Sequence, residues 1–346
     1  MHENVRTRPV MQESSSPDQT DLELVNALQI HPRATWQLLG SVLGLDPATV
    51  GRRWARLVEG GWSWICTSPT PGLADSLCSA VVEVDCRPGR AREVADELAR
   101  DPRAFTIDHV AGSGDLIVGV DTEDLAAMSE FVDGRLGRMP GVSGIRCHFV
   151  TGLLAEAGGW RLDLLDPAQQ NRLRRATTVV GTRGRTLTPT DRAIVAALHT
   201  DGRVGNASLA RQLSMSPATV RRRVEALTAS GCLVLRCELA RATAGWPVTA
   251  VYWCSAPAHA LARIGDRLRR RPETRTCVAL AGPRNVLLVS CLHSVVDVRR
   301  LECELNETVP ELLVHDRSIA YRTIKLYGHI LDDHGRRVAT VPVSAG

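Results

Sequence analysis

One unit of this 346-residue chain is present twice, with residue n of the first copy corresponding to residue n + 170 of the second. The correspondence runs without a gap from residue 21 to at least residue 140. Its most similar stretches read LDPATVGRRWARLVEG at residues 45–60 and MSPATVRRRVEALTAS at residues 215–230. Both stretches contain PATV and, two residues later, RR. For an ordinary composition, identical residues would coincide by chance at only roughly one position in fifteen. The chain is therefore a duplication, and any structural pattern assigned to one copy should hold in both.

Both repeated stretches predict an amphipathic helix that opens after a tight turn. An Asp-Pro pair at residues 46–47 and a Ser-Pro pair at 216–217 are residue types that favour a helix start. At about 100° per residue, Val220, Val224 and Leu227 share one stripe and Arg222 lies nearly opposite. The first copy repeats this spacing with Val50, Trp54 and Leu57 on the stripe and Arg52 opposite. The apolar stripe should dock, and the arginine should be presented outward.

Two earlier helical patterns precede each of these helices, which makes three helices with a tight turn before the third, the helix-turn-helix arrangement. A docked helix that offers Arg and Thr near its N-terminus has the geometry of a helix entering the DNA major groove. The predicted DNA-contacting residues are Thr49, Arg52, Arg53, Arg56, Ser216, Thr219, Arg221, Arg222 and Arg223. We expect Arg52 and Arg222 to reach bases. Arg53 and Arg223 lie about 60° from the apolar stripe and should contact phosphate or an acidic neighbour. A plainly solvated helix face is the alternative, which the repetition disfavours.

The segment after each helix-turn-helix predicts an α+β domain. Residues 62–66 and 232–239 favour extended chain, and we expect each to form a small wing beside its helices. Residues 79–150 and 248–320 then follow the order β-α-β-β-α-β, which is typical of a ferredoxin-like sheet with one uncovered face. The predicted fold is α+β, two tandem copies of a winged helix-turn-helix followed by a ferredoxin-like domain.

We expect the two open sheet faces to pair with each other, which would make one chain an intramolecular pseudo-dimer. Further homo-oligomers stay open. The predicted boundaries are a flexible tail at 1–20, helix-turn-helix units at 21–66 and 189–238, ferredoxin-like domains at 76–152 and 246–328, a linker at 153–188 and a tail at 329–346. Within the linker, Asp166 and Pro167 are suited to start one short helix.

These residues resemble the bacterial leucine-responsive and asparagine regulators, the Lrp/AsnC family. The phrases LGLDPATVGRRWARLVEGG and SMSPATVRRRVEALTASG match the family's helix-turn-helix signature, and AGSGDL at residues 111–116 resembles its effector-domain turn. The resemblance implies a sequence-specific regulator of transcription whose partners are double-stranded DNA and an amino acid or other small metabolite. It implies an effector site at Gly112, Ser113, Gly114 and Asp115.

The second copy of this turn reads AGPRNV, with Pro283, Arg284 and Asn285 in place of Ser113, Gly114 and Asp115. The first turn offers backbone donors and a carboxylate that suit a zwitterion. We therefore expect about one strong effector site per chain. A tight turn with no ligand is the alternative for both glycine positions, Gly112 and Gly282.

Composition narrows the remaining classes of function. The net charge of +4 requires any nucleic-acid surface to come from local clustering of arginines. The ten cysteines form no CxxC pair and are expected to be small core residues, and we predict no metal or other cofactor. The chain has neither an apolar run of about 20 residues nor a signal-peptide core, so we expect a cytoplasmic protein with no membrane partner.

An enzyme is disfavoured because no catalytic set is repeated. His109 corresponds to Ala279, His148 to Ser318 and Asp115 to Asn285. We predict that the protein is not an enzyme. An architectural DNA-binding protein that responds to no effector stays open as the second alternative.

Overall fold

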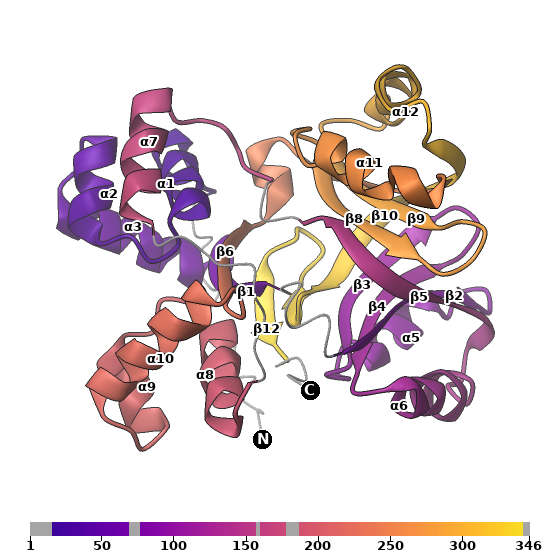
Figure 1. The fold of residues 1–346 in the computed structure, drawn as a ribbon, viewed down its shortest axis with the longest axis horizontal. Helices are drawn as coiled ribbons and strands as arrows, with labels where there is room; N and C mark the ends of the chain where they lie inside the picture. Colours follow the sequence, from indigo (N-terminus) through magenta and orange to yellow (C-terminus); the bar gives the residue numbers. More distant parts are fainter. Residues whose placement is uncertain (1–15, 69–76, 157–159, 178–186, 342–346) are drawn as a thin grey trace, which may run out of the picture.

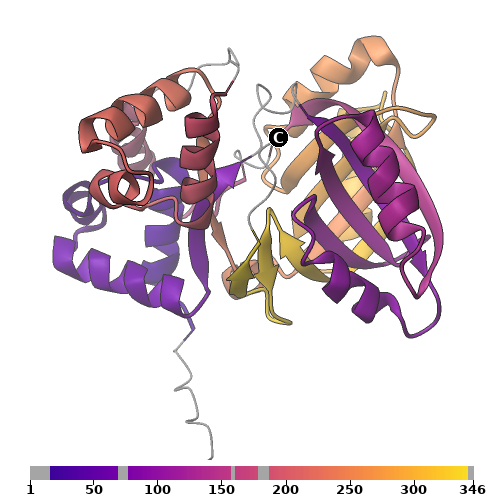
Figure 2. The same ribbon diagram turned by 90° about the horizontal axis from the view of Figure 1, so that it is seen from below.

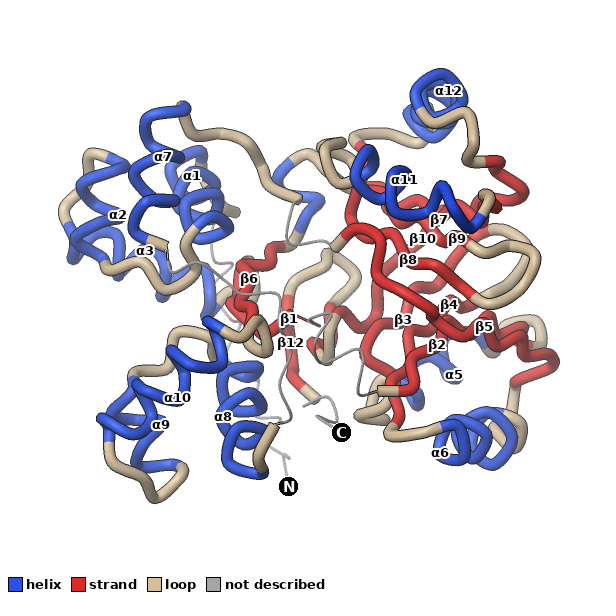
Figure 3. Tube along the Cα trace, in the orientation of Figure 1, coloured by secondary structure: helices blue, strands red, loops and turns tan. Residues whose placement is uncertain are grey.

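Two helical units lie on one side of the molecule and a sheet that closes on itself lies on the other (Figure 1). This computed structural model describes residues 16–68, 77–156, 160–177 and 187–341. Figure 3 shows the same division, with most strands on one side and a smaller group between the two parts. Across these described ranges, no helix has the length and apolar character needed to cross a membrane.

The first helical unit consists of α1 (Gln19–Ile30), α2 (Trp36–Leu43) and α3 (Pro47–Glu59). Asp18 caps α1 by accepting a hydrogen bond from the backbone N–H of Asp21, and the Asp21 side chain accepts one from Asp18 in return. Residue 18 therefore belongs to the folded unit, whereas the sequence placed residues 1–20 in a flexible tail. Helix α3 buries the predicted stripe of Val50, Trp54 and Leu57.

The second helical unit repeats the first with α8 (Pro189–Thr200), α9 (Asn206–Gln212) and α10 (Pro217–Ala229). Thr188 and Asp191 form the capping box of α8, at the positions equivalent to Asp18 and Asp21. Helix α10 buries Val220 and Leu227 of the predicted stripe, and Val224 is partly buried against the same core. The local signals that start and dock each helix were therefore sufficient to predict these elements.

The strands predicted as two separate wings form one shared ribbon instead. Strand β1 (Ser63–Ser68) pairs with β6 (Val234–Leu239) in an antiparallel register that sets Ser63 opposite Leu239. Each helical unit also packs on the strand from the other copy, α1 on β6 and α8 on β1. The ribbon therefore joins the two units crosswise, because each strand finds its hydrogen-bonding partner in the other copy.

Each copy next contributes a β-α-β-β-α-β domain, as predicted. The first contains β2 (Cys78–Cys86), α5 (Ala91–Leu98), β3 (Ala104–Ala111), β4 (Leu116–Thr122), α6 (Leu125–Ser129) with a π-helical continuation η1 (Glu130–Leu136), and β5 (Val142–Ala155). The second contains a 3₁₀ turn η3 (Arg241–Ala244), β7 (Val248–Ser255), η4 (Ala258–Ala260), α11 (Leu261–Leu268), β8 (Thr274–Leu280), β9 (Val286–Leu292), α12 (Asp297–Thr308) and β10 (Leu313–Leu326).

The two domains share a single closed barrel. Strand β5 pairs with both β2 and β8, and β10 pairs with both β7 and β3, so the order β10-β3-β4-β2-β5-β8-β9-β7 returns to β10. The fourth strand of each domain is 14 residues long, longer than predicted, because its extension pairs with the other copy. Closure leaves none of these eight strands as an open edge.

The barrel interior is built from the sheet faces that the sequence left uncovered. Helices cover the outer faces over two separate cores. The inner faces meet in a cluster to which both copies contribute, made of Val81, Val110, Ile117, Val251, Trp253, Val278, Leu280 and Leu287. The predicted pairing of the two ferredoxin-like domains thus occurs within one chain.

Two connecting segments are more ordered than predicted. Linker helix α7 (Pro167–Ala176) begins at the Asp-Pro pair and packs on α1 and α2, with Trp160 and Leu173 buried in the first helical unit's core. The C-terminal residues expected as a tail form β11 (His329–Leu331) and β12 (Arg337–Thr340). This hairpin lies between the helical side and the barrel (Figure 2), where Arg337 N–H donates to the carbonyl of Gly61 at 2.9 Å.

Candidate nucleic-acid interface

The exposed sides of α3 and α10 carry the arginines that the helical pattern directs outward. Arg52 is exposed and donates to the hydroxyl of Thr49 at 3.2 Å. Arg222 is exposed on the side of α10 away from Val220, and within the described chain it has no hydrogen bond or ion pair. Both guanidinium groups are available to an approaching ligand.

The neighbouring arginines are instead bound to acidic residues of the first helix of each unit. Arg53 Nη1 lies 2.8 Å from the carboxylate of Asp21 and 2.8 Å from that of Asp18. Arg223 Nη1 lies 2.9 Å from the carboxylate of Asp191, which corresponds to Asp21. Hydrogen bonds to Asp18 and Asp21 raise the pKa of Arg53. These two ion pairs fix α3 on α1 and α10 on α8, at the edge position that the sequence predicts.

The other predicted DNA-contacting residues differ in whether their side chains already make contacts within the protein. Arg56 also contacts Asp21. Ser216 caps α10 by accepting from Thr219 N–H at 3.1 Å, and the two hydroxyls lie 2.8 Å apart. Arg221 is exposed and lies 3.9 Å from Glu225, one helical turn away. The structure thus brings Arg52, Arg221 and Arg222 outward and gives Arg53, Arg56 and Arg223 a packing role.

A reciprocal pair of arginines, here called the arginine clasp, joins the two helical units. Arg33 donates to the carbonyls of Gly202 at 2.9 Å and Val204 at 3.1 Å. Arg203 donates to the carbonyls of Pro32 at 2.7 Å and Ala34 at 2.8 Å. The donors and the acceptors are each offset by 170 residues, so the clasp has approximate twofold symmetry.

The guanidinium group of Arg203 in the clasp is largely shielded from water. Desolvation, and then the charge of Arg33, lower the pKa of Arg203 to about 10. The Arg203 guanidinium also lies over the ring of Trp36 at 3.9 Å. We did not predict this role from the sequence, although Arg33 and Arg203 are identical at equivalent positions. With the shared ribbon, the clasp sets the position of α3 relative to α10.

A buried ionic cluster connects the ribbon to the barrel. Arg275 of β8 donates to Glu238 of β6 at 2.6 Å, and Arg236 of β6 donates to Glu156 at 2.9 Å. The Arg236 guanidinium lies 4.7 Å from the ring centroid of Tyr327. Arg236, Glu238 and Arg275 are all buried. Separating the two sides of the molecule would therefore leave buried charges without their partners, which is strongly destabilising.

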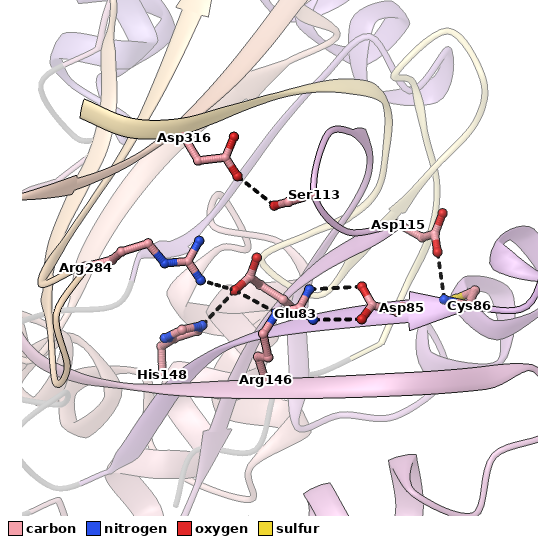
Figure 4. Close-up of polar contacts among 9 residues, drawn as sticks. All are labelled: Glu83, Asp85, Cys86, Ser113, Asp115, Arg146, His148, Arg284 and Asp316. Carbon is pink, nitrogen blue, oxygen red and sulfur yellow. Dashed lines mark hydrogen bonds and ion pairs between the residues drawn. The ribbon is translucent and has the colours of Figure 1, made fainter.

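The turn that resembles the effector site includes Ser113 and Asp115, which are labelled in Figure 4. Asp115 accepts from the backbone N–H of Cys86 at 2.7 Å. Asn285, at the equivalent position, accepts from Ala256 N–H at 2.9 Å, and residue 256 corresponds to residue 86. Both side chains therefore tie the turn to the C-terminal end of the first strand of its domain, β2 or β7, which explains why Asp and Asn exchange here.

Gly112 and Ser113 of this turn pack against β10, whereas Gly114 lies next to β2 and β5. A Cβ atom on Gly112, which has φ +151°, would lie 2.4 Å from the Ser318 hydroxyl, so only glycine permits this approach. The Ser113 hydroxyl donates to the Asp316 carboxylate at 2.7 Å. Gly114 lies beside Asp85 and Arg146. The turn thus contacts both copies, although the side chains of Ser113 and Asp115 already form hydrogen bonds within the protein.

The equivalent position in the second copy is filled by a side chain of the protein. Arg284, the counterpart of Gly114, donates to Glu83 at 2.6 Å, and His148 Nε2 lies 2.8 Å from the same oxygen (Figure 4). Burial of Glu83 opposes ionisation, but His148 and Arg284 outweigh it and lower its pKa to about 2. Arg284 also lies over the Trp253 ring at 4.4 Å. The two turns are therefore structurally unequal, as their sequences suggested.

Family comparison agrees with this architecture. A model of the AsnC-type helix-turn-helix domain matches residues 18–58 and 187–228, and a model of the Lrp/AsnC ligand binding domain matches residues 79–158. The chain belongs to the Lrp/AsnC family. The two helix-turn-helix matches support the tandem duplication.

Curated relatives are single-unit transcriptional regulators. An uncharacterized HTH-type transcriptional regulator of Pyrococcus furiosus is 25% identical over 135 residues, which cover 39% of this chain and 91% of the relative. The Bkd operon transcriptional regulator of Pseudomonas aeruginosa is 27% identical over 139 residues, which cover 38% of this chain and 89% of the relative. This Lrp/AsnC protein thus matches the helix-turn-helix part of a regulator twice and the ligand-binding part once, over its first copy.

Among solved structures, the siroheme decarboxylase NirDL has the same fold across most of the chain. Its TM-score is 0.56 over 91% of this chain and 96% of the other, with 13% sequence identity. At this identity the similarity shows the arrangement of the duplicated units and does not extend to activity.

Proposed function

We propose that this Lrp/AsnC protein is a sequence-specific DNA-binding regulator in which α3 and α10 of one chain act as a paired reading unit. The observation that carries the proposal is the combination of Arg52 and Arg222 on equivalent exposed helix faces with the arginine clasp that holds those helices in a set relation. Two reading helices related by approximate twofold symmetry match the geometry of two half-sites in the major groove.

The contacts already made within the protein suggest distinct roles for the predicted residues. Arg52 and Arg222 would read base edges, and the exposed Arg221 would contact phosphate. Thr49, Ser216 and Thr219 stand near helix N-termini, where they can donate to phosphate oxygens. Arg53, Arg56 and Arg223 would position the reading helices through their ion pairs. Since the two helices differ in sequence, the preferred site need not be a palindrome.

A small molecule bound by the barrel part would modulate this activity. The turn at residues 112–115 stays a prediction as an effector site. We also propose that the chain is not an enzyme. His148 is engaged with Glu83, and the ring of His109 packs on Tyr321 with centroids 5.2 Å apart. An architectural DNA-binding protein is the second candidate, favoured by Arg284 filling the second turn's site.

Selection of bound fragments from randomised DNA, followed by affinity measurement on the selected site, tests the function. Arg222→Ala should weaken binding by about 1–3 kcal/mol and relax base preference at one position. Arg299→Ala is a matched control, because Arg299 is an exposed arginine on α12, on the barrel side. A folded Arg222→Ala protein with an unchanged sequence profile would refute the assignment, and failure to select any sequence would favour the architectural candidate.

A further inference from the structure

A cavity of about 340 Å³ occupies the barrel interior at the end next to the second helical unit. Inner-face residues of both copies line it, including Val81, Ile117, Val251 and Val278, and α8 closes one side with Val195, Ala196 and His199. Its size lies within the range of about 300–1,000 Å³ found for small-molecule sites. It lies away from the turn of residues 112–115, none of which lines it.

Asp121 is the charged group in this cavity that lacks a charged partner. It is the inner-face residue at the end of β4, and its carboxylate accepts a hydrogen bond from the Ser79 hydroxyl at 2.6 Å. Within the described residues no arginine, lysine or histidine forms an ion pair with it. Burial raises the pKa of Asp121 to about 6, against the smaller effect of Ser79. A cation placed beside this carboxylate would be strongly favoured.

The other charged groups that line the cavity each lie near opposite charges within the protein. Arg275 is bound to Glu238, and Arg241 donates to the Thr249 hydroxyl at 3.1 Å and lies near the buried Asp108. Asp108 itself accepts from the Thr323 hydroxyl at 2.6 Å. The arginines therefore do not offer an unoccupied anion site, and Asp121 sets the charge preference.

An aromatic ring stands next to Asp121 on the same inner face. The ring of Phe105 lies over Gly119, where a Cβ atom would approach it to 2.6 Å, and Gly119 is two residues before Asp121. Tyr327 stacks on Phe105 with ring centroids 6.1 Å apart. A cavity lined by a carboxylate and by aromatic rings is suited to an ammonium group.

We propose that this cavity binds an organic amine whose apolar body lies against the inner-face valines and isoleucine and whose ammonium group contacts Asp121 beside Phe105. The apolar lining supplies the area for the body, and the single unmatched carboxylate fixes the orientation. Neutral or anionic molecules of the same shape would leave the Asp121 carboxylate without a charged partner.

Helix α8 gives this site a route to the DNA-binding part, and this step rests on the proposed function. His199 of α8 shares a hydrogen bond with Thr67 of β1 at 2.8 Å, so helix, ribbon and cavity meet at one point. A ligand that touches Val195 and Ala196 is bound partly by the second helix-turn-helix unit itself. Amine binding would therefore change the free energy of positioning α10 relative to α3.

The test uses the full chain without DNA, so its outcome is independent of the DNA-binding proposal. Phenethylamine, its neutral analogue 2-phenylethanol and the anion 3-phenylpropanoate are titrated by ligand-observed NMR and calorimetry. Phenethylamine should bind at least about tenfold more tightly than either analogue. Asp121→Asn, which keeps the side-chain size and the Ser79 contact, should weaken amine binding by about tenfold or more.

Asp266→Asn is the matched control, because Asp266 is an exposed carboxylate on α11 and does not line the cavity. It should leave amine binding unchanged. Equal binding of amine by the Asp121→Asn and unaltered proteins, preference for the anion, or absence of amine binding would overturn the proposal. An equal loss of binding in Asp266→Asn would also overturn it.

Discussion

Removal of the arginine clasp should loosen the two reading helices relative to each other without unfolding either unit. In the variant Arg33→Ala/Arg203→Ala, four hydrogen bonds from guanidinium groups to carbonyls are lost. Hydrogen bonds from charged donors contribute about 1.5–3 kcal/mol each, and the desolvation that lowers the pKa of both arginines offsets part of this. We expect each single variant to reduce the free energy of unfolding by about 2–4 kcal/mol.

The functional consequence concerns the spacing of half-sites. For the unaltered protein, inserting about five base pairs between half-sites turns one of them to the opposite face of the duplex. Binding to that DNA should fall by about 100-fold, because one reading helix no longer reaches its half-site. The clasp-free variant should lose less than about tenfold, because its helices are tethered only by the ribbon.

Fluorescence anisotropy over a series of spacer lengths measures this ratio, and urea unfolding measures the stability. Arg33→Lys is the companion variant, since lysine retains the charge but cannot donate to two carbonyls as a planar fork. We expect it to fall between the unaltered protein and Arg33→Ala. A clasp-free variant that keeps its full stability, or that discriminates spacer lengths as sharply as the unaltered chain, would refute the role given to these arginines.

Two further outcomes follow from buried groups. Glu238→Gln removes the buried anion that Arg275 and Arg236 contact, and should lower the free energy of unfolding in urea by about 3–5 kcal/mol. Glu225→Gln removes the anion of the exposed pair with Arg221 and should change that free energy by less than about 0.5 kcal/mol. Burial lowers the pKa of His199 to about 4, so its contribution is complete above the unfolded pKa of about 6.5 and is lost as pH falls toward 4. The difference in unfolding free energy between the unaltered protein and His199→Gln should shrink by about 2 kcal/mol between pH 7 and pH 5, and a pH-independent difference would contradict the assignment.

The parts predicted correctly from the sequence depend on local pattern. The stripe of Val220 and Leu227 is set by helical periodicity, and Asp-Pro or Ser-Pro pairs start helices wherever they occur. The outward direction of Arg52 and Arg222 followed from the same geometry. The order of the barrel's strands and helices could likewise be read from each copy separately.

The parts missed depend on contacts between the copies. The pairing of Ser63 with Leu239 is decided by which strand lies alongside, and nothing local distinguishes a wing from a shared ribbon. One feature of the sequence pointed to the clasp, because arginine stands at the equivalent positions 33 and 203 of both copies. That match does not reveal that the acceptors of these arginines are carbonyls of the opposite unit. Asp121 became a candidate only when closure of the barrel placed its inner face against a cavity.

The closed barrel also has a consequence for how the protein responds to its own abundance. Regulators assembled from separate subunits lose their paired form on dilution, so occupancy of a two-half-site operator then falls with roughly the square of the concentration of chains. Here both reading helices and both barrel halves are made from one polypeptide, and β5 and β10 close the ring within it. The paired reading unit is consequently present at any dilution, and occupancy should follow the first power of concentration. A few molecules per cell would therefore retain the full reading geometry, with no threshold set by subunit association.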